Sequence, residues 1–288
     1  MADSVSGSRG TAVALVLVAI VSIQSGTAAA TTLFDEVGPA GTVFLRLALA
    51  AAILLAIWRP RLAGLSREQL GLAAIFGLAL AGMNFLFYES LDRIPLGIAV
   101  TLEFVGPLAV AIWGSRRAID LLWVGLAAGG ILLLTGPGGS SPDPLGVALA
   151  LGAGACWGAY ILIAARVGRA YEGGAGLAIA MAVGALLMTA PGIASGGGDL
   201  VGVEVLGVAL GVALLCSVIP YSLELESLRR IPTPVFGVMM SLEPGVAAAI
   251  GLLALGQGLA AAEVVGIALV VVASAGALRQ AGEALPPT

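Results

Sequence analysis

The chain has 288 residues, of which 59% are hydrophobic and 10% charged, and its formal net charge is −4. A soluble domain carries roughly 25% charged residues, so this composition excludes a water-soluble protein and predicts a chain surrounded by lipid. The absence of histidine excludes histidine metal sites and Ser-His-Asp hydrolases. The sequence also lacks a phosphate-binding P-loop. We therefore expect no cofactor, no metal, no nucleic-acid partner and no ATP-driven pumping.

Ten apolar segments follow one another along the chain, each close to the roughly 20 residues that a membrane-spanning helix needs. They are rich in Ala, Leu and Gly and lack the alternating polarity of barrel strands. The sequence thus predicts an all-α membrane protein with ten transmembrane helices. The segments cover residues 11–33, 39–58, 69–90, 95–113, 119–136, 144–165, 174–194, 202–223, 232–254 and 260–279.

The first of these segments has two interpretations. Arg9, the apolar run and the small residues ending near Ala30 resemble a secretory signal peptide. However, the run is long enough to span a membrane, and its cleavage would leave nine helices. We therefore expect an uncleaved first helix.

Arginine is the only basic residue in the chain, and its distribution predicts the orientation. With ten spans and a cytoplasmic N-terminus, every arginine except Arg46 and Arg93 falls on the cytoplasmic side, which satisfies the positive-inside rule. We therefore expect both termini to be cytoplasmic. The cytoplasmic set is Arg9, Arg59, Arg61, Arg67, Arg116, Arg117, Arg166, Arg169, Arg229, Arg230 and Arg279.

One motif occurs twice. Residues 89–107 read ESLDRIPLGIAVTLEFVGP, and residues 226–244 read ESLRRIPTPVFGVMMSLEP. This duplication predicts two repeats, residues 1–138 and 142–288, joined by a Gly/Pro-rich linker. Because each repeat holds five spans, the second enters the membrane in the opposite orientation. Inverted repeats place a substrate site near the bilayer midplane between the two halves.

Three charged residues lie deep within the apolar segments. The rise along a helix places Arg46 and Glu103 about 10 and 12 Å from the periplasmic side. Glu243 falls about 14 Å from that side in a core about 30 Å thick. Since a charge at the bilayer centre is costly, we expect all three to meet in a central cavity. Two structural alternatives remain, an Arg46–Glu103 pair that only locks helices together, and a protonated, locally hydrogen-bonded Glu243.

A second set of polar residues is expected to line the same cavity. Asn84 and Tyr88 are four residues apart and share a helix face, and Tyr221 is the repeat counterpart of Asn84. Tyr88 has an alternative place in the interfacial aromatic belt. Gln24 and Ser25 either line the path or hydrogen-bond between helices.

Helix breaks and close packing are expected at several small residues. Pro107 and Pro244 follow the two buried acids and can kink their helices. Three Gly-x-x-x-Gly spacings, which allow helix backbones to approach closely, begin at Gly125, Gly154 and Gly207.

At these motifs the chain resembles the drug/metabolite transporter superfamily, with two EamA-type repeats. Residues 44–55, 102–117 and 220–257 look like the threonine/homoserine exporter branch. The resemblance implies ten helices, an inner-membrane location and export of small metabolites such as amino acids. Many EamA repeats have an acid where this chain has Gln257, so we expect no coupling role for Gln257.

These observations together predict a secondary-active exporter, not an enzyme, in the inner membrane of a bacterium. We expect it to carry amino acids or similar metabolites in exchange for protons by alternating access. Arg46 is expected to bind the substrate carboxylate, and Glu103 or Glu243 to bind the ammonium group and to couple to protons. The alternatives are efflux of drugs or other metabolites and, in another class, a non-transporting scaffold or intramembrane enzyme. The sequence leaves the oligomeric state open.

Overall fold

The computed structural model describes residues 2–61, 64–113, 118–135, 142–228, 230 and 233–283. Several residues of the sequence argument lie outside its described side chains, namely Arg9, Arg116, Arg117, Arg229, Ile231, Pro232 and linker residues 136–141.

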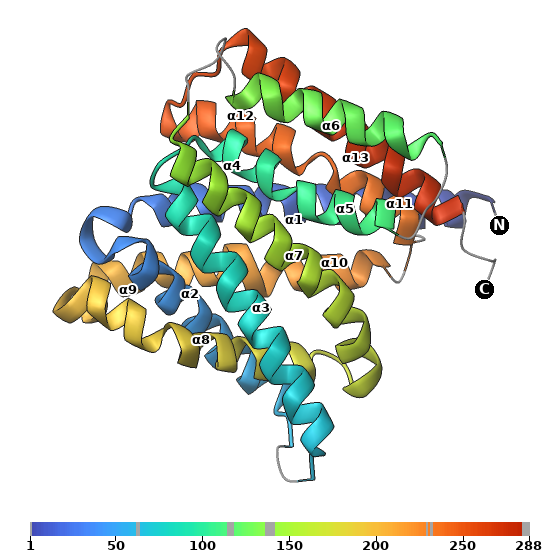
Figure 1. Cartoon of the computed structure of the whole chain (residues 1–288). Helices are drawn as coiled ribbons and strands as arrows, with labels where there is room; N and C mark the ends of the chain where they lie inside the picture. The colour runs from blue at the N-terminus through green and yellow to red at the C-terminus, as the bar shows by residue number, and fades with distance from the viewer. Residues whose placement is uncertain are drawn as a thin grey trace.

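Helices account for all the regular secondary structure in this described part, in agreement with the predicted all-α class (Figure 1). Nine of its helices or broken helix pairs are long and apolar enough to cross a membrane, and the tenth expected segment is a shorter apolar helix. The elements are α1 Ala2–Thr31, α2 Phe34–Trp58, α3 Arg67–Leu91, α4 Leu96–Glu103, α5 Val105–Trp113, α6 Asp120–Thr135, α7 Pro144–Ala170, α8 Ala175–Gly196, η1 Gly197–Val201, α9 Val203–Ala213, η2 Leu214–Val218, α10 Ile219–Leu228, α11 Thr233–Met240, α12 Glu243–Leu255 and α13 Ala261–Glu283.

Local sequence signals explain where several helices begin. Ser66 and Gln69 form a capping box at α3, in which each side chain accepts from the other residue's backbone N–H. Asp143 accepts from the N–H groups of Leu145 and Gly146 at the start of α7, which has Pro144 at its first position.

Two expected spans are broken next to their buried acid. The fourth span divides into α4 and α5 at Phe104, directly after Glu103, and the ninth divides into α11 and α12 directly before Glu243. Each break lies less than one helical turn before the proline at which the sequence predicts a kink, Pro107 or Pro244. Proline has no N–H to donate to the carbonyl four residues earlier, so the helical ladder is interrupted there.

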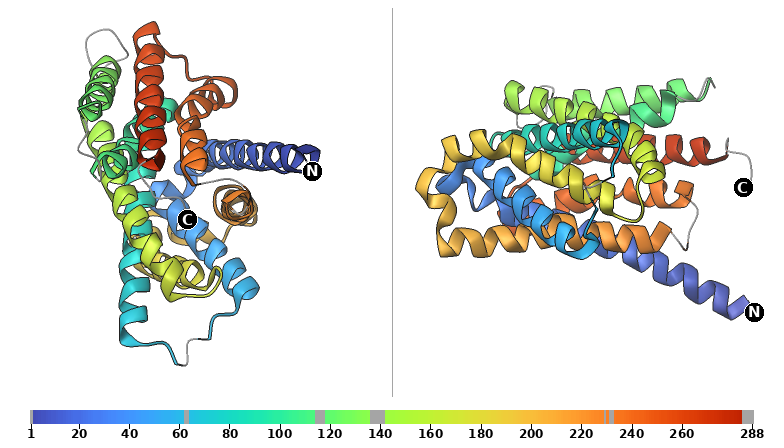
Figure 2. Two further views of the ribbon diagram at one scale, coloured as in Figure 1. Left: turned by 90° about the vertical axis from the view of Figure 1, so that its right-hand side faces the viewer. Right: turned by 90° about the horizontal axis from the view of Figure 1, so that it is seen from below.

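The helices run side by side, and the pairs in contact come from both halves of the chain (Figures 1 and 2). α2 packs against α8, α3 against α7, α4 against α12 and α6 against α13, while α1 packs against α10 and η2. The first helix begins and the last helix ends at the same side of the bundle (Figure 1). This arrangement agrees with an even number of crossings.

Glycines set the closest helix contacts. A Cβ at Gly106 of α5 would lie 1.8 Å from the Gly154 carbonyl oxygen of α7, and Gly130 and Gly266 meet similarly between α6 and α13. The spacing that begins at Gly154 therefore does bring helices together. Gly125 and Gly207, by contrast, have nothing within 4 Å of a Cβ.

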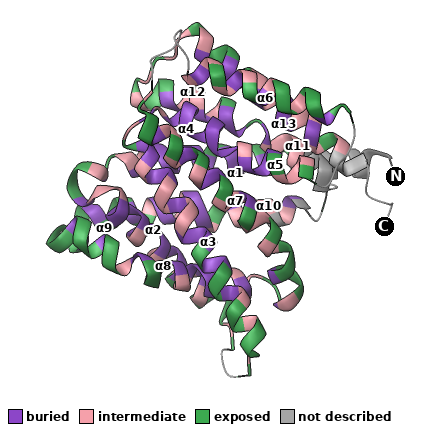
Figure 3. Ribbon diagram, in the orientation of Figure 1, coloured by how far each residue is buried: buried purple, intermediate pink, exposed green. Residues whose placement is uncertain are grey.

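Residues with exposed side chains cover the outer faces of the bundle (Figure 3). Large apolar residues such as Leu121, Leu186 and Val203 are among them, with 75%, 74% and 87% exposure. Patches this apolar suit hydrocarbon rather than water.

The duplicated motif forms the same ion pair in both copies. Glu89 and Arg93 lie 3.0 Å apart at the end of α3, and Glu226 and Arg230 lie 2.5 Å apart at the end of α10. In both pairs the arginine follows the glutamate by four residues and lies just beyond the last residue of the helix.

Candidate functional site

Arg46 is buried in the middle of α2 and is held by three neutral groups. Its Nη1 donates to the hydroxyl of Tyr88 (3.1 Å), its Nη2 to the carbonyl of Cys216 (3.1 Å) and its Nε to the hydroxyl of Ser217 (3.4 Å). The guanidinium carbon also lies 5.5 Å from the centre of the Tyr88 ring, within the range of a cation–π contact. Neutral groups of α3 and η2 thus hold the Arg46 guanidinium in place, and neither element supplies a carboxylate to pair with its charge.

The carbonyl that receives Arg46 is available because of a proline. Cys216 lies four residues before Pro220, which has no N–H to donate. In addition, the backbone N–H of Ile219 donates to Leu214, five residues back, so η2 is a π-helical turn. Single π-helical turns within α-helices are frequent at functional sites. Here the turn leaves the carbonyls of Leu215 and Cys216 without their usual helical donors.

Helix α1 packs against the same π-helical turn and hydrogen-bonds to it. The hydroxyl of Ser22 donates to the Leu215 carbonyl (2.8 Å), and the thiol of Cys216 donates to the Ile23 carbonyl (3.5 Å). A Cβ at Gly26 would lie 2.5 Å from that sulfur, so only glycine permits this approach. Cys216 is therefore a packing residue in a position that also orients Arg46.

Tyr88 belongs to the interior and not to the interfacial aromatic belt, so that alternative is wrong. Its side chain is fully buried, and its ring packs against those of Phe34 and Phe87 at centroid distances of 5.8 and 6.1 Å. The amide of Asn84, one turn earlier, donates to the Leu80 carbonyl of its own helix (2.8 Å). Tyr221 is half-buried at the edge of the main core and lies within electrostatic range of Arg46.

The two predicted acids, Glu103 and Glu243, are both buried. Glu103 is 8% exposed and Glu243 is 4% exposed. Glu103 lies within electrostatic range of Arg46, and Glu243 within that of Glu103 and Glu224. Glu103 thus interacts with both Arg46 and Glu243, whereas a central cavity that contains all three stays a prediction.

Neither structural alternative for these charges is formed. No salt bridge joins Arg46 to Glu103 in the described part of the chain, so a helix-locking pair is wrong. The carboxyl groups of Glu103 and Glu243 have no hydrogen-bond partner among the described residues, so a locally bonded Glu243 is wrong as well.

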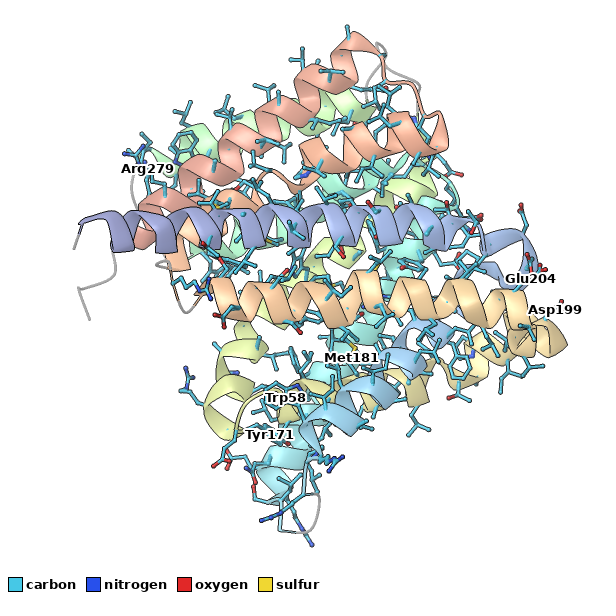
Figure 4. The ribbon with its side chains drawn as sticks, turned by 180° about the vertical axis from the view of Figure 1, so that it is seen from behind. Trp58, Tyr171, Met181, Asp199, Glu204 and Arg279 are labelled. Carbon is cyan, nitrogen blue, oxygen red and sulfur yellow. The ribbon has the colours of Figure 1, made fainter. Side chains whose placement is uncertain are left out.

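Two hollows of about 390 and 400 Å³ lie away from these charges. One is lined by Glu36, Asp199 and Glu204 near the ends of α2, η1 and α9. Asp199 and Glu204 lie at the end of the molecule opposite Arg279 (Figure 4). The other lies between α1 and α12 and includes Ser25. Neither hollow includes Arg46, Glu103 or Glu243, so neither is the predicted central cavity.

The side chains of Gln257 and Glu263 each accept a hydrogen bond from a backbone N–H near the start of a helix. The side-chain oxygen of Gln257 accepts from the backbone N–H of Leu96 (2.9 Å) and so caps α4 from the other half of the chain. Glu263 accepts from the N–H of Ala260 (2.8 Å) at the start of α13.

Sequence reasoning missed Ser217, the Cys216 carbonyl and the π-helical turn. The sequence signal for them was Pro220, because a proline inside a helix leaves the carbonyl four residues earlier without its helical donor.

Comparison with known proteins agrees with this architecture. Residues 144–279 match the EamA-like transporter family. The chain is 44% identical over 264 residues to the threonine/homoserine exporter RhtA of Salmonella typhimurium strain LT2, covering 91% of this chain and 89% of that protein. It is also 44% identical over 266 residues to RhtA of Escherichia coli strain K12, covering 92% and 90%.

A protein of known crystal structure shares the fold, with a TM-score of 0.64 and 19% identity over 96% of this chain and 99% of its own. The family is one of transporters, so the chain is a multi-pass inner-membrane exporter and not an enzyme. With the relatives' identity extending over nine-tenths of its length, the chain belongs to the EamA-type drug/metabolite transporters, in the threonine/homoserine exporter branch.

Proposed function

We propose that this exporter carries small amino acids similar to threonine and homoserine, in exchange for protons, by alternating access. The observation that carries the proposal is a buried arginine with three neutral partners and no carboxylate within ion-pairing distance among the described residues. A buried cation without a countercharge is costly, and a substrate carboxylate would supply that charge.

Planar guanidinium groups recognise carboxylates through paired hydrogen bonds. Because Tyr88, Ser217 and the Cys216 carbonyl already orient Arg46, little side-chain entropy is left to lose when substrate binds. Asn84, Tyr88 and Tyr221 would surround the bound molecule.

Glu103 and Glu243 are suited to the opposite end of an amino acid. Both lack hydrogen-bond partners among the described residues, and both lie at helix breaks. A carboxylate can hold either an ammonium group or a proton, and these two occupants compete. Such competition is the minimal requirement for exchanging substrate against protons, so we assign both roles to Glu103 and Glu243.

The opposed halves support alternating access. Residues 1–138 and 142–288 would be inverted repeats with both termini cytoplasmic, and rocking of one bundle against the other would expose the central site to each side in turn. The matching ion pairs Glu89–Arg93 and Glu226–Arg230 support this duplication.

Exchange in proteoliposomes tests the proposal. Vesicles containing the purified protein and labelled threonine are diluted into buffer at the same or at a lower pH. We expect faster release into the acidic buffer, and we expect a proton ionophore to abolish the difference. Threonine release that ignores the pH gradient would overturn proton coupling, and the absence of release would overturn the amino-acid substrate.

A further inference from the structure

We infer that Gln24 recognises the uncharged polar group of the substrate side chain and sets the preference for hydroxyl-bearing substrates; this inference rests on the proposed function. Gln24 lies in α1 and is 3% exposed. Its side-chain oxygen is fully buried and has no hydrogen-bond partner among the described residues.

An unbonded amide inside a membrane protein needs an explanation, since a buried polar group without a partner is destabilising. Other glutamines of the chain are bonded. Gln257 accepts from Leu96, Gln69 donates to the Ala170 carbonyl, and Gln280 accepts from the indole N–H of Trp123. A ligand that bonds Gln24 during transport would account for its open position.

The neighbours of Gln24 on α1 contact the elements that hold the two charged groups. Ser22 and Ile23 bond to the π-helical turn whose Cys216 carbonyl holds Arg46. One turn before Gln24, Ile20 belongs to the apolar cluster that includes Met240 and Val246, on either side of the break at Glu243. Because residues four apart on a helix are neighbours, Gln24 lies one turn along α1 from this cluster, on the helix face that Ile20 presents to it.

Gln24 differs in its surroundings from its neighbour Ser25, although both residues have the same two interpretations in the sequence analysis. Ser25 lines the outer hollow between α1 and α12, whereas Gln24 faces neither that hollow nor an identified partner. The structure therefore separates the two residues.

The chemistry of an amide favours a hydroxyl. Arg46 and the two acids complement the charged ends of an amino acid, which leaves the side chain of the substrate. An amide both donates and accepts hydrogen bonds, and so does a hydroxyl. A site built to bond a hydroxyl rejects an analogue that lacks it, because the analogue leaves the site's polar atoms unpaired.

Threonine and valine test this inference because they have nearly the same shape and differ by one hydroxyl. Proteoliposomes containing wild type or Gln24→Leu are loaded with labelled threonine, and unlabelled threonine or valine competes for transport. We expect wild type to prefer threonine by about tenfold or more, and Gln24→Leu to lose that preference mainly by accepting threonine less well. The unfolding midpoint of Gln24→Leu should not fall, since no bond is removed.

Gln280→Leu is the matched control, because it makes the same change at a glutamine that already has a partner. It should keep the wild-type preference. A Gln24→Leu protein that transports threonine and still rejects valine as wild type does would overturn the inference while leaving the proposed function intact. Wild type that transports neither amino acid would overturn both, and a Gln24→Leu protein with a lowered unfolding midpoint would show a structural role instead.

Discussion

The two sides of the polar cluster are built differently. On the side of α2, α3 and η2, Arg46 makes three hydrogen bonds to groups that packing holds in place. On the side of the breaks at α4/α5 and α11/α12, Glu103 and Glu243 are buried without such bonds among the described residues. A fixed cation can serve as a permanent binding group, whereas acids at broken helices can change partner as the helices move. In the proposed mechanism, the side of Arg46 is therefore the binding side and the side of Glu103 and Glu243 is the coupling side.

The largest expected effect comes from removing the fixed cation. Arg46→Ala should lower the rate of threonine export by at least about 30-fold, because truncating one member of a buried charge pair costs about 2–5 kcal/mol. The measurement is export by cells or vesicles at equal amounts of membrane-inserted protein. Export within a factor of two of wild type would remove Arg46 from the site.

Next come the acids on the coupling side. Glu243→Gln keeps the shape of the side chain but removes its ability to gain and lose a proton, so the acceleration of export by an acidic exterior should disappear. Exchange of labelled for unlabelled threonine without a gradient should persist at a reduced rate. Glu226→Gln, at an exposed helix end, should leave the gradient response unchanged. A Glu243→Gln protein that still responds to the gradient would assign the coupling elsewhere.

A packing change on the coupling side should act on stability. Gly106→Ala would place a methyl group 1.8 Å from the Gly154 carbonyl oxygen and separate α5 from α7, at a cost of about 1–3 kcal/mol. Thermal unfolding in detergent measures this loss. Gly125→Ala, which meets nothing within 4 Å, should unfold as wild type does. Equal unfolding midpoints for the two variants would contradict the close approach at Gly106.

The smallest effect is expected on the binding side, where three hydrogen bonds together orient Arg46, so that the loss of one leaves two in place. Ser217→Ala removes the longest of the three bonds to Arg46 and should weaken threonine binding by about fivefold, corresponding to about 1 kcal/mol. Equilibrium binding to purified protein measures the change. A loss as large as that of Arg46→Ala would mean that Ser217 contacts the substrate itself.

The sequence anticipated the coupling side better than the binding side. Prolines and acids within apolar segments can be identified directly in the sequence, and the helix breaks beside Glu103 and Glu243 follow from the prolines. The partners of Arg46 are less visible because a backbone carbonyl carries no residue identity. The side chains of Tyr88 and Arg46 meet only through the packing of α2 on α3, so hydropathy alone left Tyr88 between the interior and the interface. The bonding state of Gln24 likewise depends on what α1 contacts.

The most direct test of the central claim compares threonine with threoninol, its analogue without a carboxylate, in calorimetric binding to wild type and to Arg46→Ala. If Arg46 binds the substrate carboxylate, wild type should prefer threonine by about 100-fold, as expected for about 3 kcal/mol, and Arg46→Ala should bind the two equally weakly. If Arg46→Ala keeps the full preference for threonine, the carboxylate binds elsewhere and the account of the site is wrong.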